Sequence, residues 1–248
     1  MDKPGARGSR PAIFPAMPES GTLIITADDF GYSPRYDEGI VEAAGAGAVD
    51  SVSVMVTRNR LDPEPLLEVG VETGLHLELP RELTEGERAG ARERAAALRA
   101  LAEQLESFEA AMGRPPAYLD GHHHCHAHAG LAAPVARAAR QHGLPVRSIG
   151  AGHRRILRRE GVATPDRLIG RYSEEAEAAL PAELQPVVDS AGELPSGVTE
   201  WMVHPGHADP DSGSGYDLAR EEDLDLLLSL CLLPALRGAR LTHVAAFG

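Results

Sequence analysis

Five of the 11 histidines in this chain lie within seven positions, from His122 to His128, in the segment LDGHHHCHAHAG. Imidazole is a common metal ligand, so the segment is either an adventitious metal-binding tract or one wall of a metal site. Other fragments whose side chains can bind a metal ion decide between these two interpretations. They are TADDFG with Asp28 and Asp29, GLHLEL with His76, and VHPG with His204.

Each of these fragments lies in or directly after a short apolar run that is typical of a buried strand. The expected strands are TLIITA from Thr22, SVSVMVT from Ser51, TGLHLEL from Thr73, AYLDG from Ala117, PVRSIG from Pro145, EWMVH from Glu200 and LTHVAAF from Leu241. No clear strand occurs between Arg154 and Ser196.

Helical segments separate the expected strands. One opens at Ser33-Pro34, with a cap residue before a proline, and runs through YDEGIVEAAGAG; the others cover Ala91 to Met112, Ala132 to Gln141 and Glu221 to Leu232. Strands that alternate with helices imply a parallel sheet, and about seven such units predict a complete or partial (β/α) barrel of the α/β class. A doubly wound open sheet is the alternative.

A parallel barrel brings the carboxyl ends of its strands to one mouth, where active sites lie. Alone, each fragment has a structural explanation: the Asp pair can cap a helix, His76 can be a hydrogen-bonded core residue, and His204-Pro205 can be a turn. Because carboxylates and imidazoles follow four separate strands, we expect one functional site that they share.

Composition narrows the class of protein. A formal net charge of -13 and a pI near 5.3 argue against nucleic-acid binding, which needs a positive field. Cys125 and Cys231 form no CxxC pair, so a reducing, cytoplasmic setting is expected. Residues 1–20 lack the apolar run of a signal peptide and are expected to be a flexible leader before one domain over 21–248, and no stretch suits a membrane span.

Four fragments carry a family resemblance. TADDFGYSPRYDEGIVEAAGAGAVDSVSVMV, GLHLEL, YLDGHHHCHAH and VHPG, in this order, resemble the motifs of the YdjC-like carbohydrate deacetylases, also called the ChbG family. The resemblance implies a deformed, polysaccharide-deacetylase-like (β/α) barrel that hydrolyses the N-acetyl group of an amino sugar, usually in chito-oligosaccharides. It also implies one divalent metal ion held by Asp29, His76 and His122.

The chemistry of amide hydrolysis suits such a set. A metal ion lowers the pKa of its bound water and polarises the carbonyl oxygen, and one carboxylate with two imidazoles leaves coordination positions open. Asp28 is then the expected general base. His204 is the candidate general acid for the leaving amine, and orienting Asp28 is its alternative role.

The remaining histidines of the run have other expected roles. On an extended strand end, His122 and His124 would face one side and His123 the other, so not all five can bind one ion. We assign His124 and His126 to the second shell or the sugar pocket, and we expect Asp120 to accept a hydrogen bond from a ligand imidazole. One carboxylate and two imidazoles suit several divalent metals, and the resemblance implies that magnesium and zinc are the main candidates.

One departure from the family pattern affects the substrate. After GLHLEL the short segment PRELTEGERAG replaces a longer loop, so the sugar pocket is either more open or completed by a second subunit of a homodimer. GSGYD from Gly213 is a candidate lid. Two other functions stay open, namely a different barrel metallohydrolase of the amidohydrolase or histidinol-phosphatase type, and a non-catalytic metal- or carbohydrate-binding module.

Overall fold

A computed structural model describes residues 21–58, 60–170 and 193–231, together with 181, 182, 184, 185, 236 and 239–247. The expected leader over residues 1–20 lies outside the described residues. None of the described helices combines the length and the apolar composition needed to cross a bilayer.

Six parallel strands form the centre of the molecule. They are β1 (Thr22–Phe30), β2 (Ser51–Val54), β3 (Glu72–Leu77), β4 (Leu119–Gly121), β5 (Arg167–Gly170) and β6 (Val198–Val203), in the spatial order β4-β3-β2-β1-β6-β5. From β1 to β4 each strand pairs with the next along the chain, and β6 returns to the other side of β1, as a late strand of a barrel does. The sheet is thus a half-barrel, and the doubly wound alternative is wrong.

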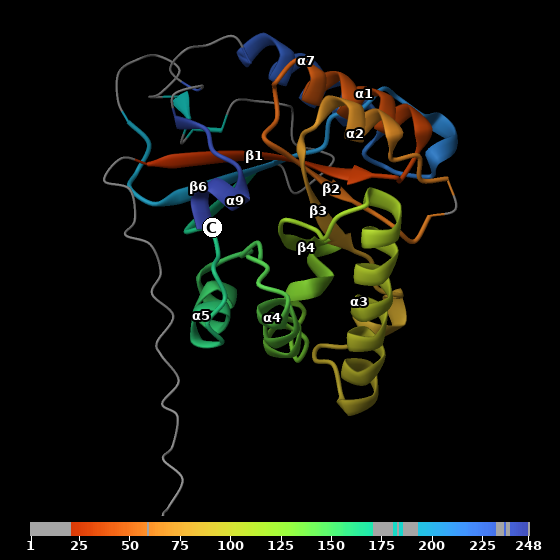
Figure 1. The fold of residues 1–248 in the computed structure, drawn as a ribbon, viewed down its shortest axis with the longest axis vertical. Helices are drawn as coiled ribbons and strands as arrows, with labels where there is room; N and C mark the ends of the chain where they lie inside the picture. The colour runs from red at the N-terminus through yellow and green to blue at the C-terminus, as the bar shows by residue number, and fades with distance from the viewer. Residues whose placement is uncertain are drawn as a thin grey trace, which may run out of the picture.

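Helices surround the strands (Figure 1). They are α1 (Pro34–Gly45), α2 (Glu64–Val69), α3 (Ala91–Met112), α4 (Ala132–Gln141), α5 (Ala151–Arg159), α7 (Asp217–Leu230) and the short α9 (His243–Phe247). In the figure α7, α1 and α2 lie together above the strands, and α3, α4 and α5 lie below them. All nine residues of β1 are buried, as expected for a parallel strand covered on both faces.

The structure corrects two expected strands. PVRSIG forms no strand, and only Val146 makes a single bridge, to Leu119, because Pro145 has no N–H for a ladder. LTHVAAF contains the helix α9, since the hydroxyl of Thr242 accepts a hydrogen bond from the N–H of Ala245 and begins a helix there.

Other differences concern elements that the apolar pattern did not reveal. The strand β5 has only four residues, three of them half-buried, and α2 and α5 are short. The helix α7 begins at Asp217, one turn before the expected Glu221. The expected helices over Pro34–Gly45, Ala91–Met112 and Ala132–Gln141 are confirmed.

Candidate active site

The site begins at an irregular end of β1. The pairing of β1 with β2 shifts its register between Ala27 and Phe30, and Asp29 has a left-handed backbone, with φ of 73°. A bulge of this kind re-aims side chains, so the consecutive residues Asp28 and Asp29 line the same cavity. A non-glycine residue in this conformation costs roughly 1–3 kcal/mol, and such strain is concentrated at functional sites.

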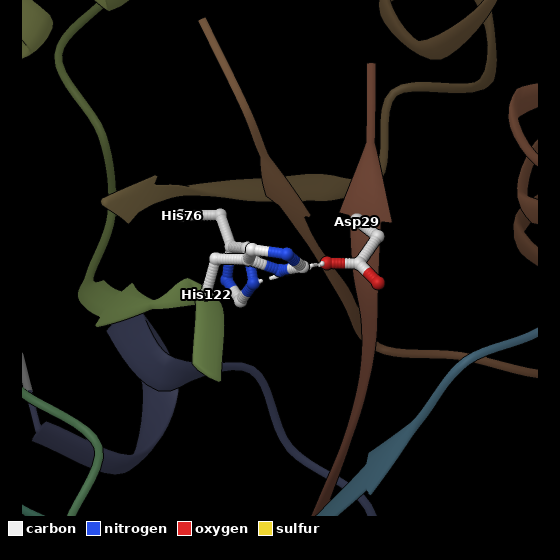
Figure 2. Close-up of side chains that lie close together, drawn as sticks. All are labelled: Asp29, His76 and His122. Atoms are coloured by element: carbon white, nitrogen blue, oxygen red, sulfur yellow. Dashed lines mark hydrogen bonds and ion pairs between the residues drawn. The ribbon is translucent and has the colours of Figure 1, made fainter. Parts of the chain in front are cut away.

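Asp29, His76 and His122 meet at this cavity (Figure 2). Oδ1 of Asp29 lies 3.2 Å from Nε2 of His76 and 2.9 Å from Nδ1 of His122. One ligand atom from each residue lies within 4.8 Å of those of the other two, a spacing that suits a single metal ion. The structure therefore brings together the three residues expected as ligands, and buried carboxylate and histidine groups there could hold a metal ion.

Asp120 holds the ring of His76. Nδ1 of His76 donates to Oδ1 of Asp120 at 2.7 Å, which is the contact expected of this carboxylate and which leaves Nε2 facing Asp29. Burial opposes a charge on His76, but the carboxylates of Asp120 and Asp28 outweigh it and raise the pKa of the imidazole well above its usual value. The ring orientation that Asp120 fixes directs Nε2 of His76 toward Oδ1 of Asp29, at 3.2 Å.

Asp28 lies beside this trio but has a different partner. Both of its oxygens accept from the buried guanidinium of Arg147, at 2.6 and 2.8 Å. Burial favours the neutral acid, but Arg147 and His76 together hold the pKa of Asp28 well below its usual range. Arg147 also pairs with Asp120 at 2.8 Å and with Glu200 at 2.8 Å, so one cation binds three buried carboxylates.

A second buried arginine holds Asp29. Nη2 of Arg220 donates to Oδ2 of Asp29 at 2.6 Å, and the guanidinium carbon lies 4.0 Å from the ring centroid of Tyr36. Because Arg220 occupies Oδ2, only Oδ1 of Asp29 faces the two histidines. The pKa of Asp29 is well below its usual value, since Arg220 and the two imidazoles outweigh the effect of burial.

His204 also lines this cavity, which has a volume of about 470 Å³. Its backbone N–H donates to Asp223 and its ring lies 5.2 Å from that of Tyr216. Burial lowers the pKa of His204 in spite of the nearby carboxylates, so the imidazole is neutral at neutral pH. Residues 213–216 of the candidate lid also line this cavity.

The histidine run is not an extended strand end. His122–Ala127 form a 3-10 helix in which His123 and His124 have left-handed backbones, with φ of 49° and 56°. His124 lines the cavity with His122, whereas His126 is fully buried and its Nε2 donates to the carbonyl of Arg147 at 3.1 Å. His126 thus contacts the backbone of Arg147 and does not line the cavity.

A larger cavity of about 1270 Å³ adjoins the first. Tyr32, His122, His123 and His124 line both of them. The guanidinium of Arg58 lies 4.6 Å from the ring centroid of Tyr32 and pairs with Glu78 at 2.5 Å. The short segment after β3 also lines this larger cavity, through Pro80, Arg81, Thr84 and Glu85.

The sequence pattern did not reveal Arg147 or Arg220. One signal was present, because Arg147 interrupts the apolar run PVRSIG, and a charged residue inside a buried segment needs an ionic partner. Arg220 lies on a helix rich in charged residues, where nothing local distinguishes it from solvent-exposed neighbours.

Comparisons with known proteins identify the family of the chain. Residues 22–237 match the family described as YdjC-like protein. The chain is 37% identical over 151 residues to a human carbohydrate deacetylase, a match that covers 49% of this chain and 46% of the human protein. It is 30% identical to a carbohydrate deacetylase of Brevibacillus brevis, covering 83% of this chain and 90% of that protein, and 29% identical to one of the mouse, covering 78% and 81%.

The fold has a solved counterpart. The structure of a candidate cellobiose-phosphate cleavage protein from Enterococcus faecalis V583 superposes with a TM-score of 0.72 at 24% identity. The match covers 93% of this chain and 100% of that one. At this level of identity the likeness establishes the half-barrel architecture alone.

Proposed function

The chain belongs to the YdjC-like protein family, and from this premise we propose that it is a metal-dependent carbohydrate deacetylase that removes the N-acetyl group of an amino sugar. The observation that carries the proposal is the meeting of Asp29, His76 and His122 at one cavity. Three relatives named carbohydrate deacetylase support the substrate class.

The residues present fit a divalent metal ion. Oδ1 of Asp29, Nε2 of His76 and Nδ1 of His122 would hold it, and magnesium and zinc are the proposed metals. When bound, the ion supplies an acidified water and polarises the acetyl oxygen. Asp120 fixes the tautomer of His76, and Arg220 leaves Oδ1 as the oxygen of Asp29 that faces the site.

Asp28 is the proposed general base. It is ionised at neutral pH and lines the cavity beside the ligand set, so it can accept a proton from the attacking water. Arg147 fixes both oxygens of Asp28 in position at the cost of lowering its basicity.

His204 is the proposed general acid. No hydrogen bond joins its ring to Asp28 among the described residues, and its Nδ1 is buried without a partner there. This favours proton transfer to the leaving amine over the alternative in which His204 orients Asp28. A neutral His204 needs to take up a proton first, and the negative charges of Asp28 and Asp29 favour that step.

The test measures acetate release from N,N'-diacetylchitobiose and from N-acetylglucosamine. Protein stripped of metal is resupplied separately with magnesium, zinc, manganese and cobalt. We expect release that depends on added metal. Asp29→Asn should lose metal binding and activity together, whereas Asp28→Asn should keep metal binding and lose at least about a hundredfold in kcat, within the range for a general base.

A matched control is Asp225→Asn, at an exposed position on α7, which should behave like the unaltered protein. Folded, metal-loaded protein that releases no acetate from either sugar would contradict the proposed reaction and favour another acylated substrate or a binding module. Full metal occupancy in His76→Ala would remove the proposed ligand set.

A further inference from the structure

The short helix α9 lies at the amino ends of β1 and β3, away from the candidate active site at their carboxyl ends. Just before the helix, the N–H of Leu241 donates to the carbonyl of Leu23 in β1 at 2.9 Å. The N–H groups of His243 and Val244 donate to Glu72, the first residue of β3, at 2.7 and 3.0 Å. The carboxylate of Glu72 therefore fixes the start of α9 against the sheet.

His243 is enclosed between carboxylates of two strands. Its side chain is 1% exposed, its Nδ1 lies 3.1 Å from Oε1 of Glu72, and its Nε2 lies 3.7 Å from Oε1 of Glu200 on β6. In Figure 1 α9 accordingly lies next to β6. Burial alone would lower the pKa of His243, but Glu200 and Glu72 outweigh it and raise this pKa above its usual value. The ring therefore keeps its positive charge to a higher pH than an exposed histidine does.

The ring of His243 also packs on a polar interior. It stacks on the ring of Tyr118, with the centroids 3.7 Å apart. A Cβ added at Gly74 would clash with Tyr118, so the glycine makes room for this stack. The hydroxyls of Tyr118 and Ser53 lie 2.9 Å apart, and that of Ser53 donates to Asp120 at 2.7 Å. Hydrogen bonds thus continue from the stack under His243 toward the candidate active site.

Glu200 connects His243 to Arg147. Oε1 of Glu200 accepts from Nε of Arg147 at 2.8 Å and is also the oxygen that faces His243. Both Nη groups of the same guanidinium donate to Asp28, at 2.6 and 2.8 Å. Arg147 pairs with three buried carboxylates, which is more negative charge than one guanidinium balances. A cation at position 243 supplies the charge that Glu200 would otherwise take from Arg147.

We propose that His243 is a positioning residue for Asp28. By balancing the charge of Glu200, it leaves the Nη groups of Arg147 to hold both oxygens of Asp28. Without His243 the guanidinium would move toward Glu200, and Asp28 would lose its fixed orientation. The inference rests on the proposed function, in which Asp28 is the general base, and it makes α9 part of the machinery of a site at the other end of the strands.

The first test is His243→Gln, which keeps a hydrogen-bond donor and removes the charge. The rate of acetate release from N,N'-diacetylchitobiose is measured with the most effective metal at a saturating concentration, so that weaker metal binding does not contribute. We expect kcat to fall about tenfold, because a misplaced base slows the reaction. We expect KM to change less than about twofold, because Asp28 is needed in the transition state more than for binding.

The matched control loosens the same segment without touching the buried charges. Arg240 pairs with Asp50 at 2.9 Å, and Arg240→Met removes this pair just before α9. This variant should keep the kcat of the unaltered protein. An equal loss of kcat in Arg240→Met and His243→Gln would overturn the proposal, because α9 would then act only as a structural support.

His243→Phe provides a second variant, because it keeps the ring that stacks on Tyr118 and removes both ring nitrogens. It should lower kcat as His243→Gln does, and it replaces His243→Gln if that variant does not fold. Unchanged kcat in a folded His243→Phe protein would show that packing alone matters, which contradicts the proposal.

A double-mutant cycle tests the route through Glu200. In Glu200→Gln the carboxylate that His243 balances is neutral, so adding His243→Gln should lower kcat less than about twofold further. An equal fall in kcat with and without Glu200→Gln would show that His243 does not act through Glu200, and the proposal would be wrong.

An NMR signal separates this inference from the proposed function. The carboxyl carbon of Asp28 is observed in aspartate-labelled protein without substrate, with Asp28→Asn used to assign it. His243→Gln should displace this signal, and Arg240→Met should leave it in place. If the unaltered protein releases no acetate, the proposed function fails, but a displaced signal still supports the positioning of Asp28 by His243. An unchanged signal in His243→Gln would overturn the inference whether or not acetate is released.

Discussion

Asp28 and Asp29 are adjacent in the chain, and each is held by a buried arginine, but the two ion pairs differ. Arg147 binds both oxygens of Asp28 and also contacts Asp120 and Glu200. Arg220 binds only Oδ2 of Asp29. The Asp28 pair thus belongs to a network inside the half-barrel, whereas the Asp29 pair leaves one oxygen facing two histidines.

Under the proposed function, this difference would give one residue type two roles. A carboxylate whose two oxygens are both bonded is fixed in place and acts through its charge or by accepting a proton. A carboxylate held by one oxygen keeps the other for a cation. The number of oxygens that each arginine occupies therefore separates the proposed base from the proposed ligand.

The largest effect is expected for Arg147→Met. Removing this guanidinium leaves Asp28, Asp120 and Glu200 buried without their shared cation, so the free energy of unfolding should fall by about 3–5 kcal/mol. Urea denaturation measures the loss, with Arg137→Met, in an exposed pair, as the control. A loss below about 1 kcal/mol, the value of a surface ion pair, would mean that the network is not a stabilising unit.

A smaller effect is expected for Arg220→Met. This variant removes a hydrogen bond to one charged oxygen, which corresponds to about 1.5–3 kcal/mol in the free energy of unfolding. It also removes a positive charge beside Asp29 and frees Oδ2. Manganese should therefore bind more tightly while kcat falls, as calorimetry and acetate release would show. Weaker manganese binding with unchanged kcat would mean that Arg220 does not keep Oδ2 of Asp29 away from the metal ion.

An effect confined to high pH is expected for Asp37, a third carboxylate near Arg220. Burial raises its pKa to about 7, although the N–H of Gly31 donates to it at 2.6 Å. Because the pKa in the folded state is raised, its stabilising contribution is complete below about pH 4 and is lost as the pH rises through 7. Asp37→Asn should match the free energy of unfolding of the unaltered protein at pH 4 and exceed it at pH 8.

Chemical denaturation at several pH values measures this difference. Glu38→Gln, which alters an exposed carboxylate on the same helix, is the control and should show no such trend. A constant difference between the Asp37→Asn and unaltered proteins from pH 4 to pH 8 would show that Asp37 titrates normally in the folded state.

The sequence predicted the parts of the fold that local patterns encode. Continuous apolar runs identify β1, β2, β3 and β6, and the proline after Ser33 identifies the start of α1. The helix α9 was mistaken for a strand because LTHVAAF is as apolar as the true strands. The hydroxyl of Thr242, which begins the helix, is a weak signal beside that composition.

The sequence predicted only those residues of the candidate site that lie in recognisable motifs. Asp29, His76 and His122 each lie in a recognisable fragment, and the order of parallel strands brings them together. Arg147 and Arg220 act through contacts with residues far away in sequence, and arginine is usually exposed. No local pattern specifies such a partner, so these two residues required the structure.

The place of β1 in the sheet also has a consequence for folding during synthesis. On one side β1 pairs with β2, which follows soon after it, but on the other side it pairs with β6, so that Thr22 meets Val198. The near pairings can form as soon as the first half of the chain is made, whereas the distant one is slow. Until β6 arrives, a long apolar strand has an open edge, and aggregation competes with folding at that step.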